Sequence, residues 1–371
     1  MLIPSVLITI TSSWAQLPDS NELSERLQAI VQAYHDAGEF HGLALVARDG
    51  ELVGRYAVGE ANRSWSVSHD VDAVFPIASL TKQFTAVLVM QAIERGELRL
   101  NDMLDLLPDF PEAVGKRVRV EHLLLHSAGF QDPDFAYYLD PRGSGKTDGM
   151  IAREYLYRQE PDFVPGTVFR YGNAEYHLLG AILELRTGKV FGELVQERIV
   201  QPLGLKDTRL ANPDVVRAKR PSDYVRDGEG WVHPTQFRWS HWQAAGGLES
   251  SLLDLHRWNQ ALVNHELLTA ESTARMLTSP GQPDPYVALG SWVYARNIPG
   301  TQVNLKLAER RGAIGGHAVL NAFDRERGEW VILYSNHGDR TLDTLSYAPC
   351  LPLDLFSAMH DGEIVRAEKS E

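Results

Sequence analysis

Hydrophobic and polar positions follow one pattern near the two ends of the chain and another in its middle. Residues 22–39 carry apolar side chains at helical spacing, and Gly42–Ala47 and Glu51–Gly59 are typical of two strands that form a hairpin. Beyond residue 285 the pattern predicts further strands and then a helix, at Leu289–Arg296, Thr301–Leu307, His317–Phe323, Glu329–Ser335 and Leu351–Met359. Strands are therefore expected at both ends of the chain.

The middle of the chain is predicted to consist of helices and long loops. Gln83–Ile93 is apolar on nearly every side, which is typical of a buried helix, and Gly96 suits its end. Ala174–Leu185 and Leu253–Val263 are also expected to be helical. We therefore predict an α+β fold, in which one antiparallel sheet is built from both chain ends and is flanked by helices. In this division residues 22–75 and 286–371 form the sheet domain, and residues 76–285 form an inserted, mostly helical region.

Composition and charge exclude several classes of function. The formal net charge is -13, which argues against nucleic acid and anionic membranes as partners. The single cysteine, Cys350, forbids an internal disulfide. Neither histidine nor cysteine occurs in pairs with metal-site spacing, so we expect no metal and no cofactor.

Residues 1–15 resemble a secretory signal peptide. Met1–Ile10 is apolar, and Ser13-Trp14-Ala15 has small residues where cleavage after Ala15 would need them, although no Lys or Arg precedes the apolar stretch. We expect an exported protein, periplasmic or secreted, with no integral membrane segment once the signal is removed. If the stretch is instead a frayed terminus or part of a core strand, the protein would be cytoplasmic.

Ser79 and Lys82 are candidates for catalysis, at the head of the predicted apolar helix. Residues at i and i+3 share a helix face, so the Lys82 amine can reach the Ser79 oxygen. A serine hydroxyl is a weak nucleophile unless a neighbouring base activates it, and a helix start supplies free N–H groups for a developing oxyanion. Ser-x-x-Lys also occurs by chance roughly once in a chain of this length, so the pair needs partners elsewhere.

Tyr171 and Asn173 are candidates for those partners. They lie just before the helix predicted at Ala174–Leu185. A phenol close to a lysine cation has a lowered pKa and can pass a proton. Asn173 can bind a substrate carbonyl, and it can equally serve as the N-cap of the helix. His126 could be catalytic, but a structural histidine bonded to backbone is the favoured interpretation.

With these residues in place, the chain resembles the serine β-lactamase and penicillin-binding-protein superfamily, particularly the branch of class C β-lactamases, β-lactamase-like carboxylesterases and D-stereospecific peptidases. The motifs that carry the resemblance, in the family's order, are Phe75–Phe84, His122–Gly129, Pro165–Thr167, Tyr171-Gly172-Asn173, Ala245–Leu248 and Ile314-Gly315-Gly316. By this resemblance Ser79 is the acylated nucleophile and Lys82 is its proton partner. Tyr171 is then the general base and acid, and Asn173 helps to position the substrate.

One motif departs from the family pattern. The slot that usually holds Lys, His or Trp, then any residue, then Gly contains Arg310-Arg311-Gly312. By the resemblance, the second oxyanion N–H would come from Ala313, next to Gly312. Arg310 keeps a positive charge with a different geometry, so it could clamp a substrate carboxylate or could be a tolerated substitution.

The expected function is that of a serine hydrolase that cleaves an ester or amide through an acyl-enzyme on Ser79. A carboxylesterase or D-amino-acid-type peptidase is favoured over a β-lactamase, because Arg310 departs from the family pattern. The alternative is a penicillin-binding or sensing module that is acylated without efficient turnover. The expected partner is a small ester, amide or peptide substrate, and the sequence does not indicate an oligomeric state.

Overall fold

The computed structural model describes residues 20–139, 146–212, 215–228, 230–338, 342 and 350–364. The segment that resembles a signal peptide, residues 1–15, lies outside these ranges.

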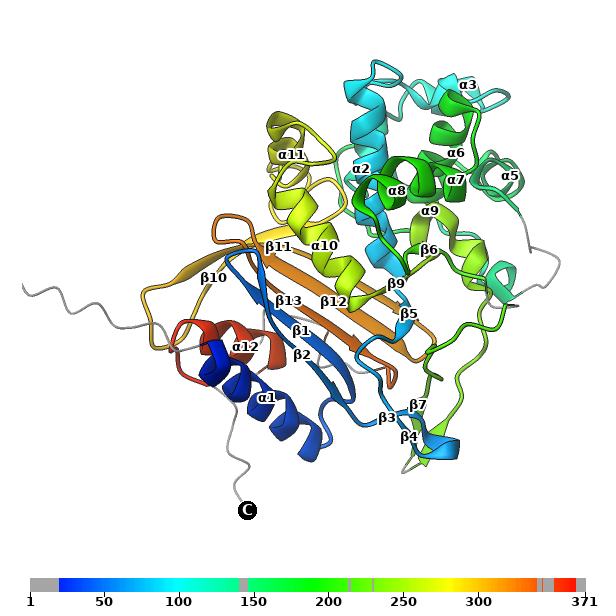
Figure 1. The fold of residues 1–371 in the computed structure, drawn as a ribbon. Coiled ribbons are helices and arrows are strands. Elements are labelled where there is room, and N and C mark those ends of the chain that lie inside the picture. The colour runs from blue at the N-terminus through cyan, green and yellow to red at the C-terminus, as the bar shows by residue number, and fades with distance from the viewer. Residues whose placement is uncertain are drawn as a thin grey trace, which may run out of the picture.

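A six-stranded antiparallel sheet forms the centre of the molecule, with the strand order β10-β11-β12-β13-β1-β2 (Figure 1). Its strands are β1 (Gly42–Arg48), β2 (Glu51–Val58), β10 (Trp292–Asn297), β11 (Asn304–Ile314), β12 (His317–Asp324) and β13 (Glu329–Ser335). The register pairs Gly42 of β1 with Ser335 of β13, so the two ends of the chain meet inside one sheet. The predicted α+β fold class is confirmed.

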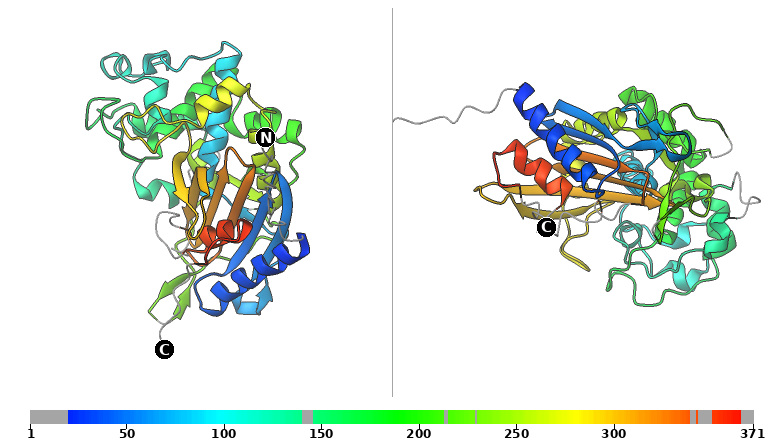
Figure 2. Two further views of the ribbon diagram at one scale, coloured as in Figure 1. Left: turned by 90° about the vertical axis from the view of Figure 1, so that its left-hand side faces the viewer. Right: turned by 90° about the horizontal axis from the view of Figure 1, so that it is seen from below.

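Two terminal helices cover one face of this sheet. They are α1 (Ser20–Asp36) and α12 (Leu351–Met359), which pack side by side in every view (Figures 1 and 2). Leu23 and Leu27 of α1 share a buried apolar cluster with Leu305 of β11. The other face is covered by the helical region, through α10 (Leu252–Val263) and α2 (Thr81–Glu94).

The helical region is arranged around α2, which is buried along most of its length as its all-round apolar sequence predicts. Phe84 of α2 stacks on Trp258 of α10, with ring centroids 3.8 Å apart. The other helices are α3 (Glu112–Gly115), α4 (Val120–Leu124), α5 (Asp148–Ile151), α6 (Ala174–Thr187), α7 (Phe191–Val195), α8 (Gln201–Leu203), α9 (Gln243–Gly246) and α11 (Ala270–Met276).

Within the described residues, three small sheets lie beside the main sheet. One has the order β5-β9-β6 and leads the chain into the start of α2. The strands of the small sheets are β3 (Glu60–Asn62), β4 (Val67–Ser68), β5 (Val74–Pro76), β6 (Arg209–Leu210), β7 (Val225–Asp227), β8 (Gly230–Val232) and β9 (Leu248–Ser251).

Strand β11 differs most from its prediction. Thr301–Leu307 was expected, whereas the strand begins at Asn304 and continues to Ile314. The charged run at residues 309–311 hides the strand pattern in the sequence, but β12 pairs with β11 as far as Ile314 opposite His317. The predicted motif Arg310-Arg311-Gly312, here called the third motif, therefore lies within a strand, on the edge that faces the start of α2.

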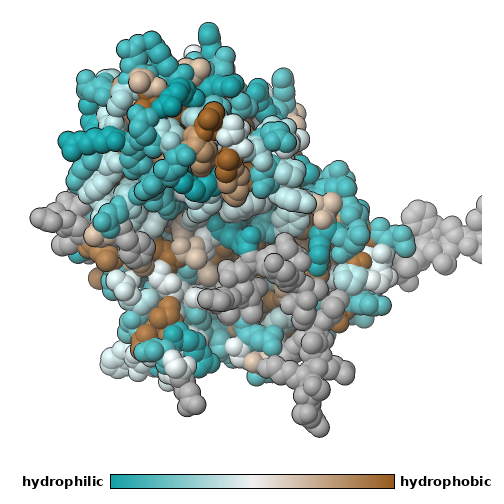
Figure 3. Space-filling model, turned by 180° about the vertical axis from the view of Figure 1, so that it is seen from behind, coloured by the Kyte–Doolittle hydropathy of each residue, from teal (hydrophilic) through white to brown (hydrophobic). Residues whose placement is uncertain are grey.

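The surface seen from behind is mostly hydrophilic, with hydrophobic residues in small separate patches (Figure 3). Across the described residues we find no helix with the length and apolar character needed to cross a membrane. The same part of the chain contains no group of three or more His, Cys, Asp or Glu residues that could hold a metal ion.

Candidate active site

Ser79 lies in a tight turn that is fixed on both sides. The turn is the 3₁₀ helix η2 (Ala78–Leu80), directly before α2. Ile77 donates its backbone N–H to the carbonyl of Leu248 at 2.9 Å, which joins the turn to β9. Ala78 has φ of +43°, a left-handed conformation that costs about 1–2 kcal/mol in a residue with a Cβ. Such strain next to the hydroxyl persists only where surrounding contacts hold it.

Lys82 is completely buried and uses all three of its N–H donors. Its Nζ donates to Ser79 Oγ at 3.2 Å, to Asn173 Oδ1 at 2.8 Å and to the carbonyl of Ala245 at 2.5 Å. Three donated bonds are the full capacity of an ammonium group. Burial lowers the pKa of Lys82, and the nearby Arg310 cation lowers it further.

The Tyr171 hydroxyl donates to Ser79 Oγ at 2.6 Å, across 92 positions of sequence. The ring lies 5.0 Å from Lys82 Nζ, and the residue is 39% exposed. Burial of the hydroxyl would by itself raise the pKa of Tyr171. The charges of Lys82 and then Arg310 outweigh that effect, so the pKa is lowered from its ordinary value. The phenol is thus able to take a proton from the serine.

Asn173 occupies the N-cap position of α6, but its side chain does not cap the helix. Its Oδ1 accepts from Lys82, and its Nδ2 donates to Asp132 Oδ2 at 2.8 Å. Asp132 Oδ1 accepts the backbone N–H groups of Asn173 and Ala174 at 2.5 and 2.8 Å, so Asp132 provides the cap instead. Sequence analysis missed Asp132, because it lies in a loop about 40 residues before the helix that it caps.

Arg310 lies beneath the nucleophile and not in the cleft. It is 1% exposed; its Nε donates to the carbonyl of Ser79 at 3.0 Å and its Nη2 to the Tyr171 hydroxyl at 3.3 Å. The guanidinium also lies 4.3 Å from the ring centroid of Trp292. This placement is a correction to the idea that Arg310 clamps a substrate carboxylate, since its donors are directed at Ser79 and Tyr171.

Gly312 brings β11 into close contact with the nucleophile's turn. A Cβ at this position would lie 2.1 Å from the carbonyl oxygen of Ile77 and 2.8 Å from the N of Ser79. Strand β10 pairs with β11 only as far as Glu309. Beyond Glu309, β11 has no partner strand on that edge within the described residues, and η2 packs against it there. Ala313 is exposed in the cleft beside Ser79. Its N–H as an oxyanion donor stays a prediction.

Ser79 lies in the wall of an open cleft of about 300 Å³ that the described residues form. Tyr171, Trp292, Arg311 and Ala313 line the same cleft. Trp292 was not singled out from the sequence, and Arg311 was named there only as the middle residue of Arg310-Arg311-Gly312, with no role assigned. An alcohol held between a phenol and a lysine, at the edge of a cleft, suits nucleophilic attack on a carbonyl group.

His126 packs behind Tyr171, at 4.6 Å between ring centroids. Its Nδ1 accepts the backbone N–H of Gly172 at 3.4 Å, as expected of a structural histidine. Burial, together with the charges of Arg310 and Lys82, holds the pKa of His126 well below its ordinary value. The ring is therefore neutral and supports the position of the tyrosine.

Comparison with known proteins identifies the family to which the chain belongs. The protein-family model described as Beta-lactamase matches residues 27–346, which is most of the chain. The chain therefore belongs to the β-lactamase family, and it is a serine hydrolase.

Two curated relatives and one solved structure illustrate the range of this family. The D-aminopeptidase of Brucella anthropi is 30% identical over 246 residues, which cover 65% of this chain and 45% of that protein. Esterase EstB of Burkholderia gladioli is 30% identical over 222 residues, 55% of each chain. The chain thus spans about half the length of these two relatives. The crystal structure of a penicillin binding protein from Bacillus halodurans has the same fold, with a TM-score of 0.72, 23% identity and coverage of 84% of this chain and 94% of that one.

Proposed function

We propose that the protein hydrolyses small esters or amides through an acyl-enzyme on Ser79. The observation that carries the proposal is the 2.6 Å contact between the Tyr171 hydroxyl and Ser79 Oγ, with Lys82 Nζ on the same oxygen. Ser79 is thus the nucleophile, Tyr171 is the proton acceptor beside it, and Lys82 is a fixed cation on the same oxygen.

Acylation begins when the deprotonated Tyr171 oxygen takes the Ser79 proton. Ser79 Oγ then attacks the substrate carbonyl, and the N–H groups of Ser79 and Ala313 receive the oxyanion that forms. Tyr171 returns its proton to the leaving group as the tetrahedral intermediate collapses. Lys82 keeps its own proton, because its three N–H groups already donate to Ser79, Asn173 and Ala245. Its positive charge, 5.0 Å from the Tyr171 ring, stabilises the phenolate.

Deacylation repeats these steps with water in place of the leaving group. Tyr171 removes a proton from the water, which attacks the acyl carbonyl, and the proton then returns to Ser79 as the acid departs. Asn173 is fixed between Lys82 and Asp132, so it can present its amide to the substrate with little loss of entropy.

Within this class we favour a carboxylesterase or a D-amino-acid-type peptidase over a β-lactamase. Two of the relatives named above, a D-aminopeptidase and an esterase, are consistent with this choice. Arg310 in place of the usual Lys, His or Trp is the chain's own departure from the family pattern, and it argues against assuming β-lactam hydrolysis.

Activity profiling of the purified protein tests the proposal. The substrates are short-chain 4-nitrophenyl esters, D- and L-amino-acid 4-nitroanilides and a chromogenic cephalosporin, each assayed with the wild type and with Ser79→Ala. We expect a burst of nitrophenol equal to the enzyme concentration, then steady turnover, and no activity above background in Ser79→Ala. Full ester hydrolysis by Ser79→Ala would refute the assignment.

The same assay separates an enzyme from a sensing module. A labelled penicillin that modifies Ser79 once per chain, with no turnover of any ester or amide, would favour the penicillin-binding alternative. Steady product release from an ester or amide would exclude it.

We also propose that the protein is exported. The apolar stretch at residues 1–10 and the small residues before position 16 are consistent with a signal peptide. Expression of the full chain followed by N-terminal sequencing tests this proposal. A mature protein that begins at Gln16 in the extracytoplasmic fraction is expected, and an intact N-terminus in the cytoplasm would contradict it.

A further inference from the structure

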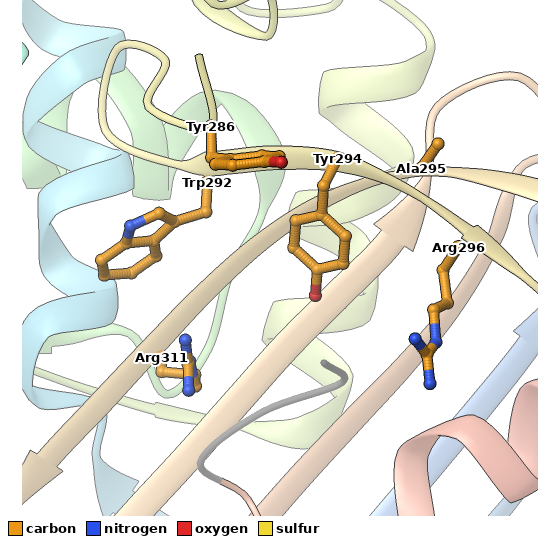
Figure 4. A pocket seen from close by; sticks show the side chains of 6 residues that line it. All are labelled: Tyr286, Trp292, Tyr294, Ala295, Arg296 and Arg311. Carbon is orange, nitrogen blue, oxygen red and sulfur yellow. The ribbon is translucent and has the colours of Figure 1, made fainter. Parts of the chain in front are cut away.

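A second groove adjoins the nucleophile's cleft and has no part in the chemistry above. It has a volume of about 340 Å³ and runs along the edge strand β10; its described lining is Tyr286, Trp292, Tyr294, Ala295, Arg296 and Arg311 (Figure 4). Trp292 and Arg311 also line the cleft of Ser79. The two hollows therefore adjoin at these two side chains, close enough for a long substrate seated on Ser79 to reach the groove.

The groove combines positive charge with aromatic surface. Its described lining includes two arginines and no carboxylate. Figure 4 shows Trp292 and Arg311 at one end and Arg296 at the other, with Tyr294 between them. Tyr286 is 59% exposed, so its ring is available to a ligand. Aromatic faces accept planar groups, and arginine binds carboxylates with a planar pair of donors.

The orientation of Arg311 is set from below. Glu309 is almost fully buried and forms an ion pair with Arg311, whose Nε lies 2.6 Å from one carboxylate oxygen, while the Tyr294 hydroxyl donates to the other oxygen. Because Glu309 takes the Nε side of the guanidinium, the terminal amino groups are left to face a ligand. Arg296 Nε is buried and has no hydrogen-bond partner among the described residues.

The position of Tyr171 indicates which part of the substrate would lie in the groove, the acyl group or the leaving group. In the proposed mechanism Tyr171 protonates the leaving group, so the leaving group departs on the side of that phenol. The Tyr171 ring lies 6.0 Å from the Trp292 ring, where the groove begins. The groove is therefore an extension of the leaving-group side of the cleft.

We propose that this groove binds the leaving group of the substrate, and that this group is aromatic or otherwise planar and carries a carboxylate. The inference rests on the proposed function for its orientation. Arg296, at the end of the groove far from Ser79, recognises the carboxylate, while Trp292, Tyr294 and Tyr286 contact the planar part. The preferred substrate is thus an ester or amide of a carboxylated aromatic alcohol or amine.

Two acetate esters that differ only in the leaving group test the proposal. They are the acetates of 4-phenylphenol and of 4′-hydroxybiphenyl-4-carboxylic acid, whose second ring carries the carboxylate away from Ser79 along the groove. Both form the same acetyl-enzyme and therefore share one deacylation rate. After correction for their uncatalysed hydrolysis, we expect kcat/KM to favour the carboxylated ester about tenfold. Arg296→Gln should remove most of this preference. Arg95→Gln, an exposed arginine outside the groove, is the matched control and should keep it.

Binding to Ser79→Ala separates this proposal from the proposed function. The free phenols serve as probes, and 4′-hydroxybiphenyl-4-carboxylic acid should bind about tenfold more tightly than 4-phenylphenol, with the difference lost in Ser79→Ala/Arg296→Gln. Equal binding of the two phenols, or an unchanged preference in Arg296→Gln, would overturn the groove's role. If neither ester is hydrolysed but the binding difference is present, the proposed function fails and the groove stands.

Discussion

Replacing Gly312 by alanine tests whether catalysis requires the close contact between strand β11 and the turn that carries Ser79. The added Cβ would lie 2.1 Å from the carbonyl oxygen of Ile77, 2.8 Å from Ser79 N and 3.0 Å from Leu80 N. All three are backbone atoms of the nucleophile's turn, so no side chain can move aside. Because interiors are close-packed, strand β11 and the turn must separate by about 1 Å.

A displacement of that size should affect catalysis far more than folding. Misplacing reacting groups by 1 Å costs about 100-fold in rate, since the oxyanion donors and the serine no longer meet one substrate position. Overpacking costs about 1–3 kcal/mol of unfolding free energy. We therefore expect kcat/KM on a short-chain ester to fall about 100-fold, while the variant still folds and melts a few degrees lower.

The assay combines ester kinetics, thermal unfolding and labelling of Ser79 by a fluorophosphonate. Gly192→Ala is the matched control, because its Cβ would meet only Leu210 side-chain atoms at 3.6 Å, an ordinary contact. Gly192→Ala should keep full activity. A Gly312→Ala protein with activity within threefold of wild type and an unchanged melting temperature would refute the argument that the strand and the turn are in obligatory contact.

Three further substitutions test the roles of individual side chains. Tyr171→Phe should lower kcat/KM about 1000-fold without loss of stability, because only the proton-transfer group is removed; a loss below tenfold would assign the base elsewhere. Arg310→Met should move the acid limb of the kcat/KM pH profile to higher pH, because the Arg310 cation lowers the pKa of both Tyr171 and Lys82; a shift to lower pH would contradict this sign. Asp132→Ala should reduce the unfolding free energy by about 1 kcal/mol and kcat/KM about tenfold, since α6 loses its cap and Asn173 loses an anchor; calorimetry and ester kinetics would measure the two effects.

Local pattern was sufficient for the parts of the site that lie within one turn of chain. Ser79 and Lys82 are three residues apart at the head of a buried helix, so their contact follows from helix geometry. Strand periodicity at both ends likewise predicted a single sheet, because the segments needed each other to bury their apolar faces. Periodicity failed in β11, where the charged residues of the third motif interrupt the pattern.

The cap of α6 illustrates a contact that no local pattern signals. Asp132 and Asn173 are 41 positions apart, and Asp132 belongs to no motif of the chain. Similarly, Trp292 enters the site because β10 begins at this residue, opposite Glu309, next to the part of β11 against which η2 packs. Such contacts depend on how separate elements are brought together, which a single sequence does not encode in its spacing.

By itself, then, the sequence determined the fold class, the family and the identity of the serine, lysine and tyrosine that meet at one oxygen. The tertiary structure decided which arginine serves which purpose. Successive residues of a strand point to opposite faces, so Arg310 is directed beneath Ser79 and Arg311 into the cleft. That choice is set by the pairing of β11 with β12 and by the close approach of Gly312 to the nucleophile's turn, and both are long-range contacts.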